Sequence, residues 1–153
     1  MKILIDRINW QGGRRSFINF SLILPSSRLT TNALIDTGSP YTVITEPTLK
    51  RTRIPYTKYD YFGTIVIGKI ILNLVELGKG TIVFKDEKNI LHPFEHDIYG
   101  GIFVDRNVEI IGTFPNIFGE DFRDKNEISI VKEQGKDYFM KLNLDSIKQK
   151  ETE

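Results

Sequence analysis

The pattern of apolar and polar positions predicts a chain built mostly of β-strands. Short runs rich in Ile, Leu, Phe and Val are separated by Gly, Pro, Asn and Asp, which favour turns. Residues 46–50 predict a short helix, because a proline such as Pro47 is tolerated in a first helical turn. The strands predicted in the first half cover residues 3–8, 17–24, 29–35 and 41–45, and residues 59–77 predict a hairpin followed by a strand.

The second half of the chain continues this pattern with more interruptions. Turn-forming residues predict turns at 78–80 and 86–89. Residues 91–101 are expected to be irregular, because they include Pro93 and the pair Gly100-Gly101. After these come a predicted strand at 108–111, a short helix at 120–125, and a last hairpin made of strands 128–131 and 138–142.

The length and composition indicate a single folded domain. A chain of 153 residues is normally one domain, and 40% hydrophobic with 27% charged residues is typical of a soluble globular protein with a real core. We expect this domain to cover residues 1–146. The charged segment 147–153 is expected to be a frayed tail.

The charge balance and the lack of cysteine exclude several classes of function. Twenty-one basic and twenty acidic residues give a net charge of +1, which offers no global attraction to nucleic acid or to an acidic membrane. Without cysteine, neither disulfides nor thiolate metal sites can form. The first ten residues are too polar for a signal peptide, and no apolar run is long enough to span a membrane. We therefore expect a cytoplasmic protein with no nucleic-acid or membrane partner.

The most informative stretch is Asp36-Thr37-Gly38-Ser39, which stands between two apolar runs. Aspartate is disfavoured inside strands, so an aspartate at this place needs a local reason. Thr37 offers a hydroxyl that can tie down a turn, and Gly38 tolerates unusual backbone angles. Such a turn holds a carboxylate rigidly at a surface cleft. Asp36 is therefore the candidate functional residue of this turn.

This loop resembles the active-site loop of the retropepsins, the short retroviral type of aspartic protease. The resemblance implies an all-β, acid-protease-like closed barrel with one short C-terminal helix, over about residues 14–142. In that family, a second signature of two apolar residues and a glycine precedes the helix. Ile117-Phe118-Gly119 fits this signature better than Ile110-Ile111-Gly112, because Pro115 disfavours helical geometry in the residue before it. Where the family often carries a basic residue after this glycine, the chain has Glu120.

The resemblance also implies a flap, which is a glycine-containing β-hairpin that closes over the substrate. Residues 61–68 are the candidate by position and composition. The expected flap residues within this segment are Phe62, Gly63, Thr64 and Ile65.

Retropepsin chemistry needs two carboxylates around one water molecule, one ionised as the base and one protonated as the acid. The chain has one Asp-Thr-Gly motif, so the resemblance implies a symmetric homodimer in which two copies of Asp36 meet. Thr37 would then hydrogen-bond across the two-fold axis, Gly38 would leave room beside the carboxylates, and Ser39 would donate a hydrogen bond to Asp36. The predicted function is an aspartic endopeptidase that acts on a peptide or protein substrate without a cofactor.

Other interpretations of these motifs stay open. The same fold can lose catalysis and act as a dimerisation or peptide-binding module, and Asp36 can lie in an ordinary turn of an unrelated β-barrel. His92 and His96 have the four-residue spacing of helical metal ligands, but the stretch around them lacks helical periodicity. We expect these histidines in a solvated loop, and we expect no metal site.

Overall fold

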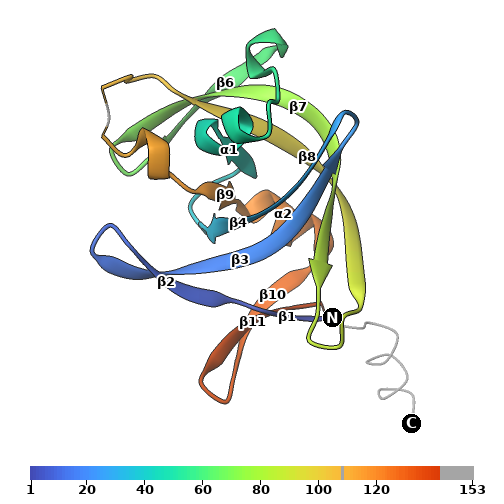
Figure 1. Ribbon diagram of the computed structural model, residues 1–153. Coiled ribbons are helices and arrows are strands. Elements are labelled where there is room, and N and C mark those ends of the chain that lie inside the picture. Colours follow the sequence, from blue (N-terminus) through green and yellow to red (C-terminus); the bar gives the residue numbers. More distant parts are fainter. Residues whose placement is uncertain (108, 142–153) are drawn as a thin grey trace.

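The computed structural model describes residues 1–107 and 109–141 of the chain (Figure 1). Strands make up most of this part, which confirms the all-β fold class. The segment 147–153, predicted as a frayed tail, lies outside the described residues, as does Val108, the first residue of the strand predicted at 108–111. The domain limit at residue 146 therefore stays a prediction.

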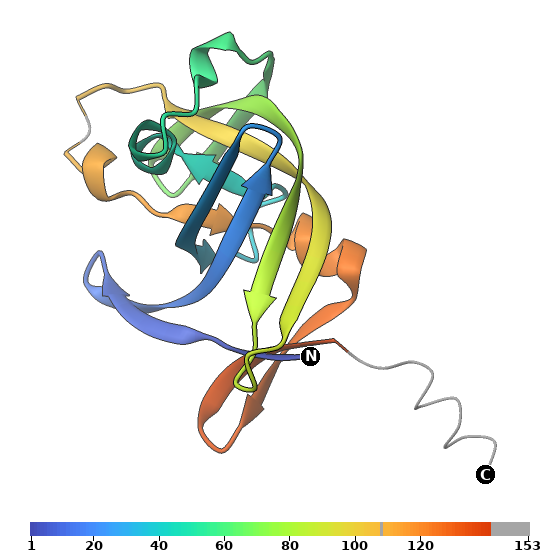
Figure 2. The ribbon, with the colours of Figure 1, turned by 45° about the vertical axis from the view of Figure 1, so that its right-hand side comes forward.

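One large sheet curls on itself and forms the body of the molecule. Its strands are β2 (Asp6–Trp10), β3 (Gly13–Leu24), β4 (Ser27–Ile35), β5 (Val43–Thr45), β6 (Tyr61–Ile67), β7 (Ile70–Lys85), β8 (Leu91–Phe103) and β9 (Asn116–Phe118). In the described chain they follow the order β2-β3-β4-β9-β5-β8-β7-β6. A further antiparallel pairing of β3 with β7, which includes Leu22 opposite Ile82, closes the sheet into a barrel-like ring (Figure 2).

A small antiparallel sheet joins the two ends of the described chain. Strand β1 (Lys2–Leu4) pairs with β11 (Lys136–Lys141), which also pairs with β10 (Ile128–Glu133). In both ribbon views the N-terminus lies beside the β10–β11 hairpin. The last hairpin predicted from the sequence is therefore confirmed over its described residues.

Short helices complete the described part of the chain: α1 (Glu46–Arg51), α2 (Glu120–Asn126), and the 3₁₀ turns η1 (Tyr56–Lys58) and η2 (Ile111–Thr113). Both predicted α-helices are confirmed, and a proline stands in the first turn of α1. The Phe122 ring of α2 is fully buried and lies 5.8 Å from Phe84 of β7 and 4.9 Å from Phe118 of β9. Helix α2 is thus packed onto the ring of strands. Among the described residues, no helix combines the length and apolar character that a membrane crossing requires.

Two of the predicted strands, at 3–8 and at 108–111, differ from the structure. The strand predicted at 3–8 is divided at Ile5, whose N–H donates to the carbonyl of Asp137 at 2.9 Å, so that β1 and β2 join different sheets. Ile5 stays buried, and the apolar pattern therefore does not reveal the break. The end of the strand predicted at 108–111 instead enters the 3₁₀ turn η2.

Strands β7 and β8 are much longer than predicted. The turn expected at 78–80 is wrong, because Gly78 at φ 92° lies at a β-bulge and β7 continues to Lys85. The irregular stretch expected at 91–101 is wrong as well, since β8 pairs with β7 along its whole length. Pro93 is tolerated because β5 reaches β8 only at residues 99–101, so β8 has a single partner strand at the proline.

Gly100 and Gly101 do not form a loop, and they allow neighbouring strands to pack closely. A Cβ atom on Gly101 would lie 2.6 Å from Cγ1 of Val43, and one on Gly100 would lie 2.9 Å from Cγ2 of Val75. The two glycines therefore let β5 and β7 approach β8 closely. This packing matters for the site, because β5 is the strand that follows the Asp36 loop.

Strand β9 lies between two apolar clusters that form the core. Ile117 and Phe118 are neighbours on this strand, and each belongs to a different cluster. Both side chains are at most 1% exposed. The first cluster includes Ile18, Leu22, Phe84, Phe122 and Phe139, and the second includes Leu34, Val43, Leu74 and Phe103. The strand that supports the Asp36 loop is therefore buried on both faces.

Candidate active site

The Asp36 loop and the apolar-apolar-Gly signature lie next to each other. Strand β4 runs parallel to β9, with Ile35 opposite Phe118. Directly after this pair, the backbone N–H of Asp36 donates to the carbonyl of Phe118 at 3.0 Å. Segments about eighty positions apart in the sequence therefore meet at the candidate catalytic residue.

The Asp36 carboxylate is held by the backbone of its own turn. The N–H of Gly38 donates to Oδ1 at 2.9 Å, and the N–H of Ser39 donates to the carbonyl of Asp36 at 3.2 Å. This is the local turn that an aspartate followed by a glycine favours. Asp36 is half-buried, while Thr37 and Gly38 are exposed. The turn thus presents a fixed carboxylate at the surface of the protomer.

Ser39 has a different partner from the one expected. Its side chain is buried, its hydroxyl donates to the carbonyl of Tyr41 at 2.9 Å, and its Oγ accepts the N–H of Tyr41 at 3.4 Å. A hydroxyl has a single hydrogen to donate, so the predicted hydrogen bond from Ser39 to Asp36 is wrong. The carbonyl of Ser39 instead accepts the N–H of Glu120 at 2.8 Å, which ties the loop to the first residue of α2.

Gly119 fills a place where a side chain has no room. A Cβ atom there would lie 2.3 Å from the carbonyl oxygen of Tyr41 and 2.6 Å from its carbon. At Gly112, the glycine of the rejected signature, a Cβ atom would meet nothing within 4 Å. The close approach of the loop to the start of α2 thus explains the glycine. The neighbouring Glu120 pairs with Arg123 at 2.7 Å and, in the first turn of the helix, interacts favourably with the helix dipole.

The hairpin predicted as a flap is formed by β6 and β7. Gly68, at φ 61°, lies at its turn, and the register shifts between Tyr61 and Gly63, which leaves Phe62 at a bulge. Thr64 donates from its hydroxyl to Oδ1 of Asn73 on the opposite strand at 2.9 Å. Ile65 is half-buried against the second core cluster. The hairpin is confirmed, and its closing over a substrate stays a prediction.

Three aromatic rings connect the base of this hairpin to the Asp36 loop. The Phe62 ring lies 5.2 Å from Tyr41 and 4.6 Å from Tyr99, and the two tyrosine rings are 5.0 Å apart. Tyr41 belongs to the loop that leaves Asp36, and Tyr99 belongs to β8. Burial raises the pKa of the Tyr99 phenol above its ordinary value, and the nearby Asp97 carboxylate adds to the effect.

The tip of the hairpin borders an apolar cavity that sequence analysis did not anticipate. The cavity has a volume of about 560 Å³, and its lining includes Ile67 and Ile70 of the hairpin together with Trp10 and Phe114. Trp10 and Phe114 contact each other edge-on, with ring centroids 5.7 Å apart. No pattern in the sequence joins these residues, because they come from β2, the β6–β7 turn and the segment after η2.

The two histidines also lie elsewhere than expected, because β8 replaces the predicted loop. His92 contacts Asp86 at 2.8 Å in the predicted turn at 86–89, and this hydrogen bond lowers the pKa of the Asp86 carboxyl. His96 is buried and contacts Asp121 of α2 at 2.8 Å. Within the described residues, no group of three or more His, Asp or Glu side chains is placed to hold a metal ion.

Comparison with solved structures gives several matches of low sequence identity. A crystal structure of a retropepsin-like aspartic protease from Rickettsia conorii matches with a TM-score of 0.55 and 15% identity, over 91% of this chain and 90% of that chain. EIAV protease complexed with the inhibitor HBY-793 matches with a TM-score of 0.49 and 16% identity, over 82% of this chain and 100% of that chain. The retroviral protease-like domain of Ddi1 from Leishmania major matches with a TM-score of 0.40 and 11% identity, over 82% and 94%.

Comparison by sequence finds nothing comparable. No protein-family model matches the chain, and no curated protein matches it. The match to the Rickettsia conorii protein covers nearly the whole of both chains, and it therefore concerns the complete arrangement of strands rather than one motif. Together with the parallel pairing of β4 and β9 beneath the Asp36 turn, this match shows that the chain has the fold of the retropepsin-like aspartic proteases.

Proposed function

We propose that the chain is an aspartic endopeptidase whose active site forms from two copies of Asp36 in a homodimer. The observation that carries this proposal is the Asp36 turn, which holds a carboxylate at the protomer surface within a retropepsin-like fold. One protomer supplies one such turn, and the chemistry requires two carboxylates. The exposed Thr37 and Gly38 leave the turn accessible to the same turn of a second copy.

The mechanism follows from the chemistry of two neighbouring carboxyl groups. Like charges close together cannot both ionise readily, so the pair shares one proton. The ionised Asp36 takes a proton from water as the water oxygen attacks the carbonyl carbon of the peptide bond. The protonated Asp36 donates a hydrogen bond to the carbonyl oxygen. A carboxyl group then transfers a proton to the leaving nitrogen, and the C–N bond breaks.

Two further features support a peptide or protein as the substrate. The β6–β7 hairpin contacts the segment after Asp36 through Phe62, so its movement would reach the active-site loop. The cavity at its tip is lined by Trp10, Phe114 and two isoleucines, which suits apolar substrate side chains.

We propose a cytoplasmic location, since the chain has no cysteine to benefit from an oxidising compartment.

The substitution Asp36→Asn tests the proposal. It keeps the size of the side chain but removes the base and the shared proton, so peptide cleavage should fall by about a hundredfold or more. Asp105→Asn is a matched control, because Asp105 is exposed and also accepts a hydrogen bond on Oδ1 from the backbone two residues later, at 2.9 Å. Cleavage rates of a fluorogenic peptide library are measured for both variants, with circular dichroism as a check of folding.

The possible outcomes separate the two candidate functions. Unchanged cleavage by Asp36→Asn would show that another group performs the chemistry. A wild-type protein that forms dimers and binds peptides without cleaving any of them would instead be a dimerisation or peptide-binding module of the same fold.

A further inference from the structure

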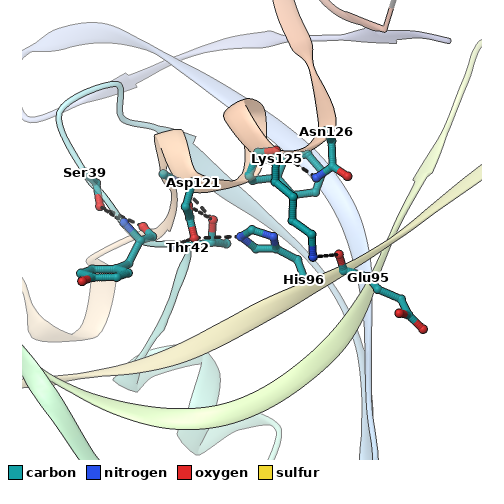
Figure 3. A network of polar contacts seen from close by, with 10 residues as sticks. Ser39, Thr42, Glu95, His96, Asp121, Lys125 and Asn126 are labelled. Atoms are coloured by element: carbon teal, nitrogen blue, oxygen red, sulfur yellow. Dashed lines mark hydrogen bonds and ion pairs between the residues drawn. The ribbon is translucent and has the colours of Figure 1, made fainter.

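We propose that His96 is a positioning residue for the Asp36 loop, acting through Asp121 and Thr42. Thr42 is the last residue of the loop before β5, and Asp121 is the second residue of α2. The effect on catalysis rests on the proposed function, whereas the contacts and their effect on loop order do not. Figure 3 shows the imidazole of His96 reaching from β8 toward the Asp121 carboxylate, with Thr42 on the other side.

The Asp121 carboxylate accepts hydrogen bonds from three donors. The Thr42 hydroxyl lies 2.9 Å from Oδ1, the Thr42 N–H lies 3.2 Å from Oδ2, and Nε2 of His96 lies 2.8 Å from Oδ2. The Thr42 oxygen accepts the N–H of Gly119 at 3.3 Å, so its single hydrogen points to Asp121. Together with the Gly119 contact, these three hydrogen bonds join the end of the Asp36 loop, the glycine of the second signature, the start of α2 and β8.

The donors also explain why residue 121 is an aspartate. An ionised carboxylate is an acceptor at both oxygens, and every group that faces it here is a donor. An asparagine offers one acceptor oxygen, and its NH₂ group would face at least one of the Thr42 or His96 donors. An aspartate therefore matches these donors better than an asparagine, and the second residue of a helix is a favourable place for an acidic side chain.

The same geometry selects one tautomer of His96. Since Asp121 accepts, Nε2 must carry the hydrogen. The Nδ1 atom is buried and has no hydrogen-bond partner among the described residues. A bare Nδ1 loses only an acceptor interaction, whereas a hydrogen on it would be a buried donor without an acceptor. The side chain is 5% exposed and its ring packs edge-on against Phe122, with centroids 5.3 Å apart. A hydrogen on Nε2 and none on Nδ1 is thus the arrangement that fits these contacts.

Strand β8 is a firm support for this histidine. It pairs with β7 along its whole length and with β5 at Val43 opposite Tyr99, three residues beyond His96. A second contact between α2 and β8 lies close by, where Nζ of Lys125 donates to the carbonyl of Glu95 at 3.1 Å. The contact of His96 with Asp121 therefore fixes Thr42, at the end of the Asp36 loop, relative to the long strand β8. The loop has little regular structure of its own.

Substitutions at His96 test the proposal. His96→Phe keeps the ring volume but removes the donor, and His96→Gln returns an N–H donor at a similar reach. We expect His96→Phe to lower kcat about tenfold with KM nearly unchanged, because a hydrogen bond to a charged group is lost and the loop alone is affected. His96→Gln should recover most of the rate. His92→Phe is the matched control, since His92 makes the same 2.8 Å contact to an aspartate far from the loop and should leave kcat unchanged.

Two measurements give an answer that does not depend on activity. NMR of the ring nitrogens in the wild-type protein should show Nε2 protonated and Nδ1 unprotonated. Hydrogen exchange at the Thr42 and Gly119 amides should be faster in His96→Phe than in His92→Phe, relative to their global stabilities. If His96→Phe does not fold, the ring tautomer of the wild-type protein and the measurements on His96→Gln still test the proposal.

The results that would overturn the proposal are distinct from those that would overturn the proposed function. A protonated Nδ1, or equal exchange in the His96 and His92 variants, shows that His96 does not position the loop. A wild-type protein that cleaves no peptide, but has the Nε2–H tautomer and the exchange difference, contradicts the protease and leaves the positioning role in place.

Discussion

Ser39 has a buried hydroxyl that hydrogen-bonds within the Asp36 loop and not to the Asp36 carboxylate. Its hydrogen bond to the Tyr41 carbonyl predicts that Ser39→Ala lowers the free energy of unfolding by about 1 kcal/mol. Because the hydroxyl does not reach Asp36, the acidic limb of the plot of kcat/KM against pH should stay in place. Urea unfolding and pH–rate profiles of wild type and variant check both effects, with the exposed Ser26→Ala as a control.

A shift of the acidic limb to higher pH, by about one unit, would contradict this prediction. Such a shift would mean that Ser39 turns toward the carboxylate in the active protein.

At the level of elements, the contact between the loop and the start of α2 depends on one glycine. Gly119→Ala would place a methyl group 2.3 Å from the Tyr41 carbonyl oxygen, which is backbone, and Gly119 directly follows Phe118, whose carbonyl accepts the N–H of Asp36. We expect a loss of at least about 2 kcal/mol in the free energy of unfolding. Gly112→Ala, with open space around it, should change this value by less than about 0.5 kcal/mol.

Chemical denaturation of both glycine variants makes this comparison. A larger loss for Gly112→Ala would assign the second signature to Ile110-Ile111-Gly112 instead.

The aromatic contacts at the base of the β6–β7 hairpin lead to a prediction about turnover. Phe62→Ala removes two ring contacts, to Tyr41 and Tyr99, so the hairpin loses its aromatic contact with the segment that follows Asp36. We expect kcat/KM to fall roughly fivefold to tenfold, since each aromatic pair is worth about 1 kcal/mol. Val66→Ala on the same hairpin is the control, because Val66 is 65% exposed. Equal kinetics for both variants would show that the hairpin acts without this contact.

For the molecule as a whole, the proposed dimer makes activity depend on concentration. Each protomer would hold half of a site, so activity per mole should fall steeply below the dimer dissociation constant. Addition of excess Asp36→Asn protein should also inhibit the wild type, because mixed dimers have one functional carboxylate. Enzyme dilution and sedimentation are measured over the same range. Sedimentation of a pure monomer at a concentration that still cleaves peptide would contradict the dimer.

The sequence alone allows the local features of this fold to be predicted. The turn at Asp36, the helix with its single inward Phe122 and the hairpin at 128–141 each depend on residues within one short segment. The predictions are wrong where contacts between distant segments determine the local structure. A glycine such as Gly78 gives the same local signal at a bulge as at a turn, and Gly101 looks like a loop residue until Val43 lies against it.

In the candidate site, too, local features can be predicted from the sequence and contacts between distant segments cannot. The turn at Asp36 can be predicted because it depends on neighbouring residues, while the partner of Ser39 depends on where the Tyr41 carbonyl points. His96 could not be connected with Asp121, because no sequence pattern relates a residue of one strand to a helix twenty-five positions later. The cavity at the hairpin tip joins three separate segments and left no signal either.

The direct pairing of β4 with β9 has a consequence for comparing sequences. Between Ile35 and Phe118 the chain also forms β5, β6, β7 and β8, which belong to the barrel-like ring, so its length can vary only in the connections, such as residues 86–90 between β7 and β8. The entropy of closing a flexible connection rises slowly, by about 0.6 kcal/mol for each doubling of its length. Residues can therefore be added to or removed from such connections without displacing the pair of Ile35 and Phe118. The number of residues between the two signatures is therefore a weak criterion for relating this chain to other sequences. The presence of both signatures, at any spacing, is a stronger criterion.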